Sequence, residues 1–195
     1  STPFDESAVK LLESVNAPAY KVASFEVTDL TLLRCIASTK KPVIMSTGMA
    51  NRNEIDEAVK TLFENGTSEL AILHCVSGYP TTPEDANLKT IVDLKERYKC
   101  KVGFSDHSKD SDIAMAAVAA GAEVIEKHIG IENQKKGLDI KFSLRGKEIK
   151  SFRKVIDKSY KLLGKNEFFR NKSENKSKVF RRSIFTIKDI KKGEK

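Results

Sequence analysis

The feature that most constrains the fold is a series of short apolar runs, each of which ends abruptly in polar residues. The runs occupy residues 19–24, 41–45, 70–75 and 101–104, and a fifth begins at 124–125. Strands that are apolar along their whole length are buried on both faces, which is typical of a parallel sheet. Helical spacing of apolar residues follows each run, at 30–37, 53–63, 88–94, 113–120 and about 147–163. An earlier helix carries Val9 and is capped by Asp5 or Ser7.

The polar residues gather where the runs end, and this placement favours a barrel. They are Ser24 and Glu26, then Ser46, Thr47 and Gly48, then Ser77 and Tyr79, then Ser105, Asp106 and His107, and finally His128. A (β/α)8 barrel builds its active site from loops at the carboxyl ends of several strands. An open doubly wound sheet commonly carries a glycine-rich first loop, which this sequence lacks. The predicted fold class is therefore α/β, a (β/α)8 TIM barrel.

Five strands do not close an eight-stranded barrel, so we predict a partial one. Residues 1–3 have the pattern of a sixth strand's tail, and we expect the first two strands and most of the third to be missing. The predicted barrel portion is residues 1–164, and a polar linker follows at 165–180. Alternating apolar residues at 182–190 predict a strand that opens a small second domain at 181–195.

Composition argues against a disulfide-rich, zinc-stabilised or membrane-spanning protein, and it leaves nucleic-acid binding open as an alternative. The net charge is +8, and lysine and arginine are dense after residue 135, where Phe168, Phe169 and Phe180 also lie. Basic residues with aromatics suit single-stranded nucleic acid, although such tails bind small anions equally well. The cysteines number three and have no CxxC spacing, which argues against a disulfide framework or structural zinc and for a cytoplasmic setting. No apolar run is long enough to span a membrane.

The chain has three histidines, and two of them predict a metal site. His107 and His128 end two successive apolar runs, so a parallel sheet would bring their side chains to the same edge. Neutral imidazole is the commonest protein ligand for divalent metals. His74 lies slightly before the end of its run and is expected either to be packed or to lie behind the ligands, and not to bind the ion itself. Asp106, beside His107, could orient the site.

Six short motifs resemble the sialic acid synthase family of phosphoenolpyruvate-condensing enzymes. They are STPFD at 1–5, YKVASFE at 20–26, PVIMSTGM at 42–49, HCVSGYP at 74–80, GFSDH at 103–107 and EKH at 126–128. Residues 181–194 resemble the entry into the family's antifreeze-like (SAF) domain. Ala23, Phe25 and the segment 139–144 are most similar to the pseudaminic acid synthases.

The resemblance implies a role for each matching residue. His107 and His128 would bind Mn²⁺, or alternatively Mg²⁺ or Co²⁺. Glu26 would be the general base for an attacking water, and Lys21 would act both in catalysis and in binding. The residues implied around phosphoenolpyruvate are Thr2, Lys21, Ser24, Ser46, Ser77, Tyr79 and Ser105. The family commonly has asparagine in place of Ser77. Asp139 would contact the acceptor sugar, while Glu126 and Lys127 are open between site roles and a structural ion pair.

The implied activity is that of a transferase. Phosphoenolpyruvate would condense with an N-acetylated hexose to form a nonulosonic acid, pseudaminic acid first and N-acetylneuraminic or legionaminic acid as the alternatives. The family's homodimer, with an SAF domain reaching over from the partner subunit as a lid, would complete the site. Because the expected early strands and most of the SAF domain are missing, we expect these residues alone to be inactive.

Two readings outside this activity stay open at the level of sequence. The first is another barrel enzyme, either a metal-dependent aldolase or a different phosphoenolpyruvate-condensing synthase. An aldolase would act on pyruvate and release no phosphate. A binding module for nucleic acid or an anionic surface would depend on the basic last third of the chain. Its affinity would fall steeply with salt, and it would need neither His107 nor His128.

Overall fold

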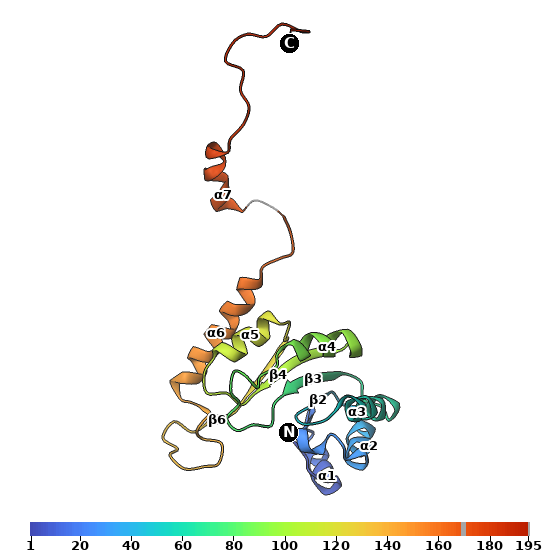
Figure 1. Ribbon diagram of the computed structural model, residues 1–195. Helices are drawn as coiled ribbons and strands as arrows, with labels where there is room; N and C mark the ends of the chain where they lie inside the picture. The colour runs from blue at the N-terminus through green and yellow to red at the C-terminus, as the bar shows by residue number, and fades with distance from the viewer. Residues whose placement is uncertain (169–170, 195) are drawn as a thin grey trace. The chain divides into compact units, whose positions relative to one another are not determined.

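The computed structural model describes residues 1–168 and 171–194. The chain divides into two units, Ser1–Leu163 and Gly164–Lys195. The first unit contains a parallel sheet and six of the α-helices, with each strand followed by a helix (Figure 1). It carries every residue that the sequence assigns to the candidate site.

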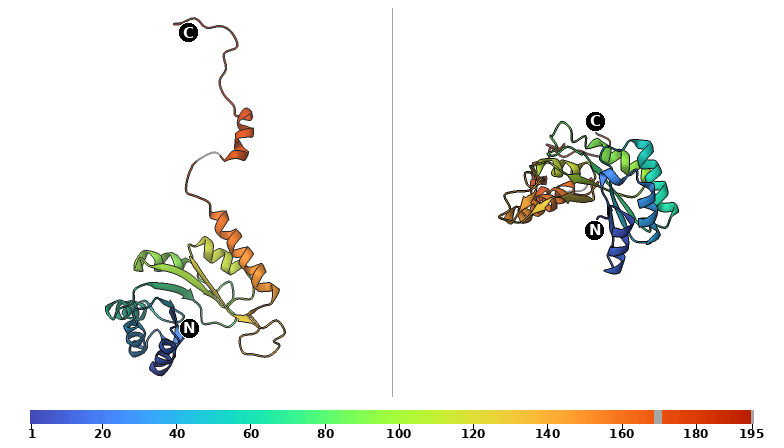
Figure 2. Two further views of the ribbon diagram at one scale, coloured as in Figure 1. Left: turned by 180° about the vertical axis from the view of Figure 1, so that it is seen from behind. Right: turned by 90° about the horizontal axis from the view of Figure 1, so that it is seen from below.

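The sheet of the first unit has five strands in the order β1-β2-β3-β4-β5, and every neighbouring pair is parallel. The strands are β1 (Tyr20–Val22), β2 (Val43–Ser46), β3 (Leu70–Cys75), β4 (Lys101–Asp106) and β5 (Val124–Lys127). Each lies on one of the predicted apolar runs, and the parallel pairing is confirmed. The sheet curls as part of a barrel, with β1 and β5 as its two edges (Figure 2).

The helices lie along the convex side of the curled sheet (Figure 2). They are α1 (Glu6–Ser14), α2 (Leu30–Ser38), α3 (Arg52–Glu64), α4 (Lys89–Tyr98), α5 (Asp112–Ala119) and α6 (Lys147–Leu163). Asp5 caps α1 by accepting the Ala8 N–H at 2.8 Å, as the sequence predicts. Asn51 and Glu54 form a capping box at the start of α3, one residue earlier than the predicted onset near Asn53.

The core lies between the sheet and this helical layer. Tyr20, Met45, Ile72 and Phe104 supply fully buried side chains from four of the strands. From the helices come Leu33, Ile36, Leu62 and Ile91, which are also fully buried. The apolar stripe of each helix therefore packs on the sheet, and the strand ends are held in fixed positions relative to one another.

Gly103 allows β4 and β5 to approach closely. A Cβ at this position would lie 2.3 Å from the carbonyl oxygen of Val124 and 2.6 Å from Cδ2 of Leu73. The carbonyl cannot yield without breaking the pairing of Gly103 with Val124. We expect Gly103→Ala to lower the free energy of unfolding by about 1–3 kcal/mol, as overpacking does. Urea denaturation measures this change.

Gly78→Ala is the matched control, because a Cβ there would meet its nearest atom at 3.8 Å. That variant should keep its stability or gain slightly from a less flexible unfolded chain. Equal stability of the two variants would contradict the packing argument for Gly103.

His74 is buried in the core, which is the first of the two positions expected for it. Its Nε2 lies 2.8 Å from the carbonyl oxygen of Ala86, and burial lowers the pKa of the imidazole from its usual value. Below about pH 6.5 the His74 imidazole takes up a proton in the unfolded chain but stays neutral in the folded chain. The free energy of unfolding therefore falls as the pH drops below about 6.5. We expect His74→Gln to weaken this loss, measured as the difference in unfolding free energy between pH 7.5 and pH 5.5. An unchanged pH dependence in the variant would contradict it.

The loop after β5 is more ordered than predicted. Its first residues, β6 (Ile129–Gly130), pair in parallel with β7 (Leu144–Arg145), which directly precedes α6. Between them the chain makes an excursion that returns Phe142 to a buried position with 4% of its surface exposed. This loop therefore has a fixed base, and Phe142 anchors it.

In the second unit the expected strand is not formed. Residues 181–194 contain no strand, and Ile184, Phe185 and Ile187 are exposed. A strand needs a neighbour for its backbone groups, and the described part of this unit offers none. The segment predicted as a linker contains α7 (Lys172–Ser177) and a short 3-10 helix, η2 (Lys178–Phe180). Phe169 and Lys195 lie outside the described residues.

No helix within the described residues is both long enough and apolar enough to cross a membrane.

Candidate functional site

The carboxyl ends of β1–β5 and the loops that follow them form what we call the strand-end rim. One group of side chains there spans the sheet from edge to edge and is termed the lysine cluster. It consists of Lys21 on β1, Ser46 on β2, Ser105 on β4 and Glu126 on β5. Lys21 Nζ donates to Ser46 Oγ at 2.8 Å and lies 3.5 Å from Glu126 Oε1. Ser105 Oγ donates to the same carboxylate oxygen at 2.7 Å.

A second group surrounds Gly48, at the loop after β2. Gly48 has a φ of +49°, and a Cβ on it would lie 2.6 Å from Ser24 Oγ and 2.8 Å from Ser77 Oγ. Two predicted hydroxyls therefore converge on a backbone position that only glycine leaves open. The Ser77 oxygen is buried without a hydrogen-bond partner, whereas Ser24 donates to Cys75 Sγ at 3.3 Å. An unsatisfied buried hydroxyl at this position is suited to a polar ligand.

The third group, the imidazole cluster, contains both predicted metal ligands. The ring centroids of His107 and His128 lie 5.2 Å apart, and Tyr79 lies 4.5 Å from His107. Phe142 packs against all three rings, at 5.2–6.0 Å from their centroids. Asp139 Oδ2 lies 3.6 Å from His128 Nδ1. The structure thus brings together residues from three separate loops, as the sequence predicts for the two histidines.

The hydrogen bond of His107 leaves one nitrogen of its ring free for a ligand, and within the described residues the His128 ring has only the 3.6 Å polar contact with Asp139. His107 Nδ1 lies 3.0 Å from the carbonyl oxygen of Val76. A carbonyl can only accept, so Nδ1 carries the proton and Nε2 keeps its lone pair. Burial, followed by the neighbouring His107, lowers the pKa of His128, which favours the neutral form that binds metals. Asp139 lies on the Nδ1 side of His128 at 3.6 Å, which is longer than a hydrogen bond, so its effect on the ring is electrostatic.

These residues fit two positions of a divalent ion's coordination sphere. Within residues 1–168 and 171–194, no group of three or more His, Cys, Asp or Glu side chains is arranged to hold a metal ion. The other positions would therefore belong to water or substrate oxygens, which is the arrangement of a catalytic rather than a structural site.

Glu26 and Thr2 lie at the β1 side of the rim. Glu26 ends the 3-10 helix η1 (Ser24–Glu26), and its Oε2 is buried without a hydrogen-bond partner. A carboxylate oxygen left in this state needs a donor such as water or a substrate hydroxyl. Thr2 is partly buried, and the Ser1 carbonyl before it accepts the Lys21 N–H at 2.8 Å. That bond places the start of the chain alongside β1.

Lys127 and Glu126 do not pair with each other, because consecutive strand residues point to opposite faces. Glu126 joins the lysine cluster, whereas Lys127 Nζ donates to Asp106 Oδ2 at 2.8 Å. Both partners of this second ion pair are buried, with 4% and 0% of their side chains exposed. Asp106 also accepts the Ser108 N–H at 2.8 Å, so it fixes the loop that carries His107.

Two further site residues have only weak signals in the sequence. Phe142 is the single aromatic residue between Gly130 and Leu144, which is the one hint that this loop has an anchor. Cys75 lies between Ser24 and His107, with its Sγ 3.3 Å and 3.9 Å from their side-chain atoms. Nothing in its spacing distinguishes it from an ordinary buried strand cysteine.

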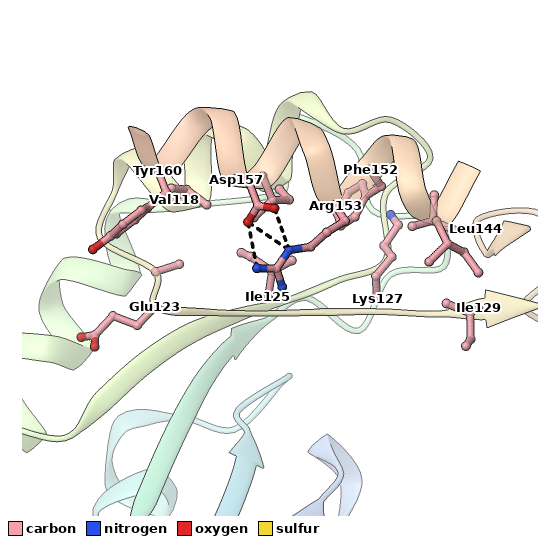
Figure 3. A pocket seen from close by; sticks show the side chains of 13 residues that line it. Val118, Glu123, Ile125, Lys127, Ile129, Leu144, Phe152, Arg153, Asp157 and Tyr160 are labelled. Atoms are coloured by element: carbon pink, nitrogen blue, oxygen red, sulfur yellow. Dashed lines mark hydrogen bonds and ion pairs between the residues drawn. The ribbon is translucent and has the colours of Figure 1, made fainter. Parts of the chain in front are cut away.

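A cavity of about 570 Å³ lies away from the rim, between β5 and α6 (Figure 3). Its walls are largely apolar and include Ile125 and Phe152. Arg153 and Asp157, which also line it, neutralise each other at 2.8 Å. None of the predicted site residues lines this cavity, so the candidate site is the rim and not the cavity.

The chain is similar in sequence to known proteins over its whole length. The chain is 42% identical to the N,N'-diacetyllegionaminic acid synthase of Campylobacter jejuni, covering 100% of this chain and 59% of that protein. It is 41% identical to the pseudaminic acid synthase of Helicobacter pylori, covering 100% and 57%. The chain thus spans somewhat more than half the length of these curated relatives.

Solved structures agree with the sequence relatives. The N-acetylneuraminic acid synthetase of Leptospira borgpetersenii, crystallised with citrate, superposes with a TM-score of 0.85 and 36% identity, covering 92% of this chain and 63% of that one. The phospho-2-dehydro-3-deoxyheptonate aldolase (DAHP synthase) of Thermotoga maritima shares the fold at a TM-score of 0.72 and 18% identity, covering 84% of this chain and 50% of that one. The family model described as NeuB family matches residues 1–168. The chain belongs to the NeuB family.

Proposed function

We propose that this chain carries the active-site rim of a nonulosonic acid synthase, which condenses phosphoenolpyruvate with an N-acetylated hexose. The observation that carries the proposal is the juxtaposition of the lysine cluster, the Gly48 hydroxyls and the imidazole cluster on one rim. The relatives make legionaminic and pseudaminic acids, and their identities to this chain, 42% and 41%, are nearly equal. Pseudaminic acid is our first choice of product, on residues Ala23 and Phe25.

The lysine cluster and the neighbouring hydroxyls would bind phosphoenolpyruvate. Its phosphate and carboxylate require several hydrogen-bond donors and a cation. Lys21 supplies the charge, while the hydroxyls of Ser24, Ser46, Ser77 and Ser105 lie around it or at the adjoining loop. Thr2 and Tyr79 would close the two ends of this donor set.

The imidazole cluster would bind the ion and the acceptor sugar. His107 and His128 would hold Mn²⁺, with Mg²⁺ or Co²⁺ as alternatives, and the bound ion would polarise the aldehyde oxygen of the sugar. Asp139, half exposed beside His128, would accept hydrogen bonds from the sugar hydroxyls. Tyr79 and Phe142, whose ring centroids lie 5.7 Å apart, would form an apolar side of this acceptor site.

The proposed reaction joins C3 of phosphoenolpyruvate to the sugar aldehyde and releases inorganic phosphate. C3 of phosphoenolpyruvate attacks the aldehyde carbon, a C–C bond forms, and the aldehyde oxygen takes up a proton to become a hydroxyl. Positive charge then develops at C2, where water adds while Glu26 accepts its proton. The C2–O bond to phosphate then breaks, the new C2 hydroxyl gives its proton to the departing phosphate, and C2 becomes the ketone of the nonulosonic acid.

The proposal includes a homodimer in which the SAF domain of a partner subunit covers the rim. It is supported by the resemblance of residues 181–194 to the entry into that domain. A cytoplasmic location is also proposed, because phosphoenolpyruvate is an intracellular metabolite and the cysteines are free.

Phosphate release from phosphoenolpyruvate tests the function directly. The complete gene product that carries these residues is assayed with a panel of N-acetylated hexoses, with and without Mn²⁺, and products are identified by mass spectrometry. Metal-dependent phosphate release with one sugar is expected, and the residues 1–195 alone should give none. Pyruvate-dependent condensation without phosphate release would instead indicate an aldolase, and salt-sensitive nucleic-acid binding without either activity a binding module.

A further inference from the structure

The contact between Lys21 and Glu126 joins the two edge strands of the sheet across the rim. We propose that Glu126 is an internal counter-ion, which occupies the place of the substrate's anionic group on Lys21 and Ser105 and leaves when the anion binds. This inference rests on the proposed function, since it concerns the same site. The sequence left open a structural ion pair between Glu126 and its neighbour Lys127. The proposed role of Glu126 is a different one, in the site itself.

The hydrogen-bond inventory of Ser105 makes the two anions competitors. A serine hydroxyl has one hydrogen to donate, and Ser105 donates it to Glu126 Oε1 at 2.7 Å. Ser105 is 3% exposed, so solvent does not offer its hydroxyl a ready replacement for Glu126 as acceptor. A substrate carboxylate or phosphate can accept this hydrogen only after Glu126 has given it up.

Lys21 is held in place by contacts that do not involve Glu126. Its Nζ donates to Ser46 Oγ at 2.8 Å and to the Val22 carbonyl at 3.1 Å, whereas Glu126 lies at the longer distance of 3.5 Å. The ammonium group therefore keeps its position when Glu126 moves away. A lysine ammonium has three hydrogens to donate, so one remains for an incoming anion once Glu126 has left.

Glu126 is free to move, because 39% of its side chain is exposed, against 15% for Lys21. A partly solvated ion pair is weak, and the released carboxylate can be hydrated. A phosphate dianion carries more charge than a carboxylate and offers more acceptor oxygens. The exchange would thus favour a phosphate-bearing ligand over pyruvate, which presents one carboxylate.

Calorimetric titration of the 195-residue chain with inorganic phosphate and with phosphoenolpyruvate tests the counter-ion role. Glu126→Gln removes the charge, and we expect it to tighten phosphate binding about three- to tenfold, in line with the modest energy of a partly exposed pair. Glu126→Asp keeps the charge but shortens the side chain by one methylene, so it loses contact with Lys21 and Ser105. It should tighten binding as Glu126→Gln does.

Glu123→Gln is the matched control, since Glu123 precedes the same strand but pairs with Lys95 at 3.2 Å, away from the rim. It should leave both dissociation constants unchanged. A Glu126→Asp variant that binds phosphate like the unmodified chain would overturn the inference. Tighter binding by Glu126→Gln would then reflect only the loss of a negative charge that repels the phosphate, and not the loss of a contact with Lys21 and Ser105. Weaker binding by Glu126→Gln, or no phosphate binding by any form, would overturn it as well. Phosphate binding with the expected pattern but no phosphoenolpyruvate binding would reject the proposed function and keep the counter-ion.

Discussion

Replacing Lys127 with methionine is expected to lower the free energy of unfolding by about 3–5 kcal/mol, the usual cost of breaking a buried ion pair. The substitution keeps the length of the side chain but leaves Asp106, which is fully buried, without its cation. Lys127 also donates to the Ser108 carbonyl, so a second buried acceptor loses its partner. An unpaired carboxylate in this position must either remain charged at high cost or take up a proton.

Urea denaturation of the variant measures the loss, and a second substitution separates charge from packing. Lys127→Met combined with Asp106→Asn removes the uncompensated charge, so it should recover part of the stability. Lys95→Met is the control, because its pair with Glu123 is about half exposed and should contribute less than about 1 kcal/mol. Similar losses for Lys127→Met and Lys95→Met would show that burial of the pair does not matter.

Mutation of His107 to alanine is expected to weaken Mn²⁺ binding at least about 100-fold, because substitution of groups that only orient metal ligands already costs about 10- to 100-fold. The proposed site has two protein ligands, so the variant would keep a single imidazole, His128. The chain's affinity for Mn²⁺ is measured directly, by paramagnetic resonance of the free ion, and this readout does not depend on activity.

The third histidine provides the comparison for this experiment. His74 is buried in the core and bonded to Ala86, so His74→Gln should leave Mn²⁺ binding unchanged. His128→Ala should resemble His107→Ala. Mn²⁺ binding that survives both alanine variants would reject the metal site, while a loss with His74→Gln would place the ion elsewhere.

The sequence by itself determined the parallel sheet and the position of the rim. Each apolar run became a strand because uninterrupted apolar residues must be buried on both faces. Parallel strands then bring their carboxyl ends to one side, and so the proximity of His107 and His128 could be predicted from chain order alone. The five strands and the helix at Lys147–Leu163 follow local patterns of this kind.

Only the tertiary structure decided which side chains became partners. Glu126 pairs with Lys21, which lies at the opposite edge of the sheet, and this contact depends on how strongly the sheet curls. The predicted strand at 182–190 failed for the related reason that pairing requires a neighbouring strand, whatever the local pattern. Phe142 reached the histidines because its loop folds back between β6 and β7. Local periodicity specifies which face of an element is buried, whereas contacts between distant elements depend on the packing of the whole sheet.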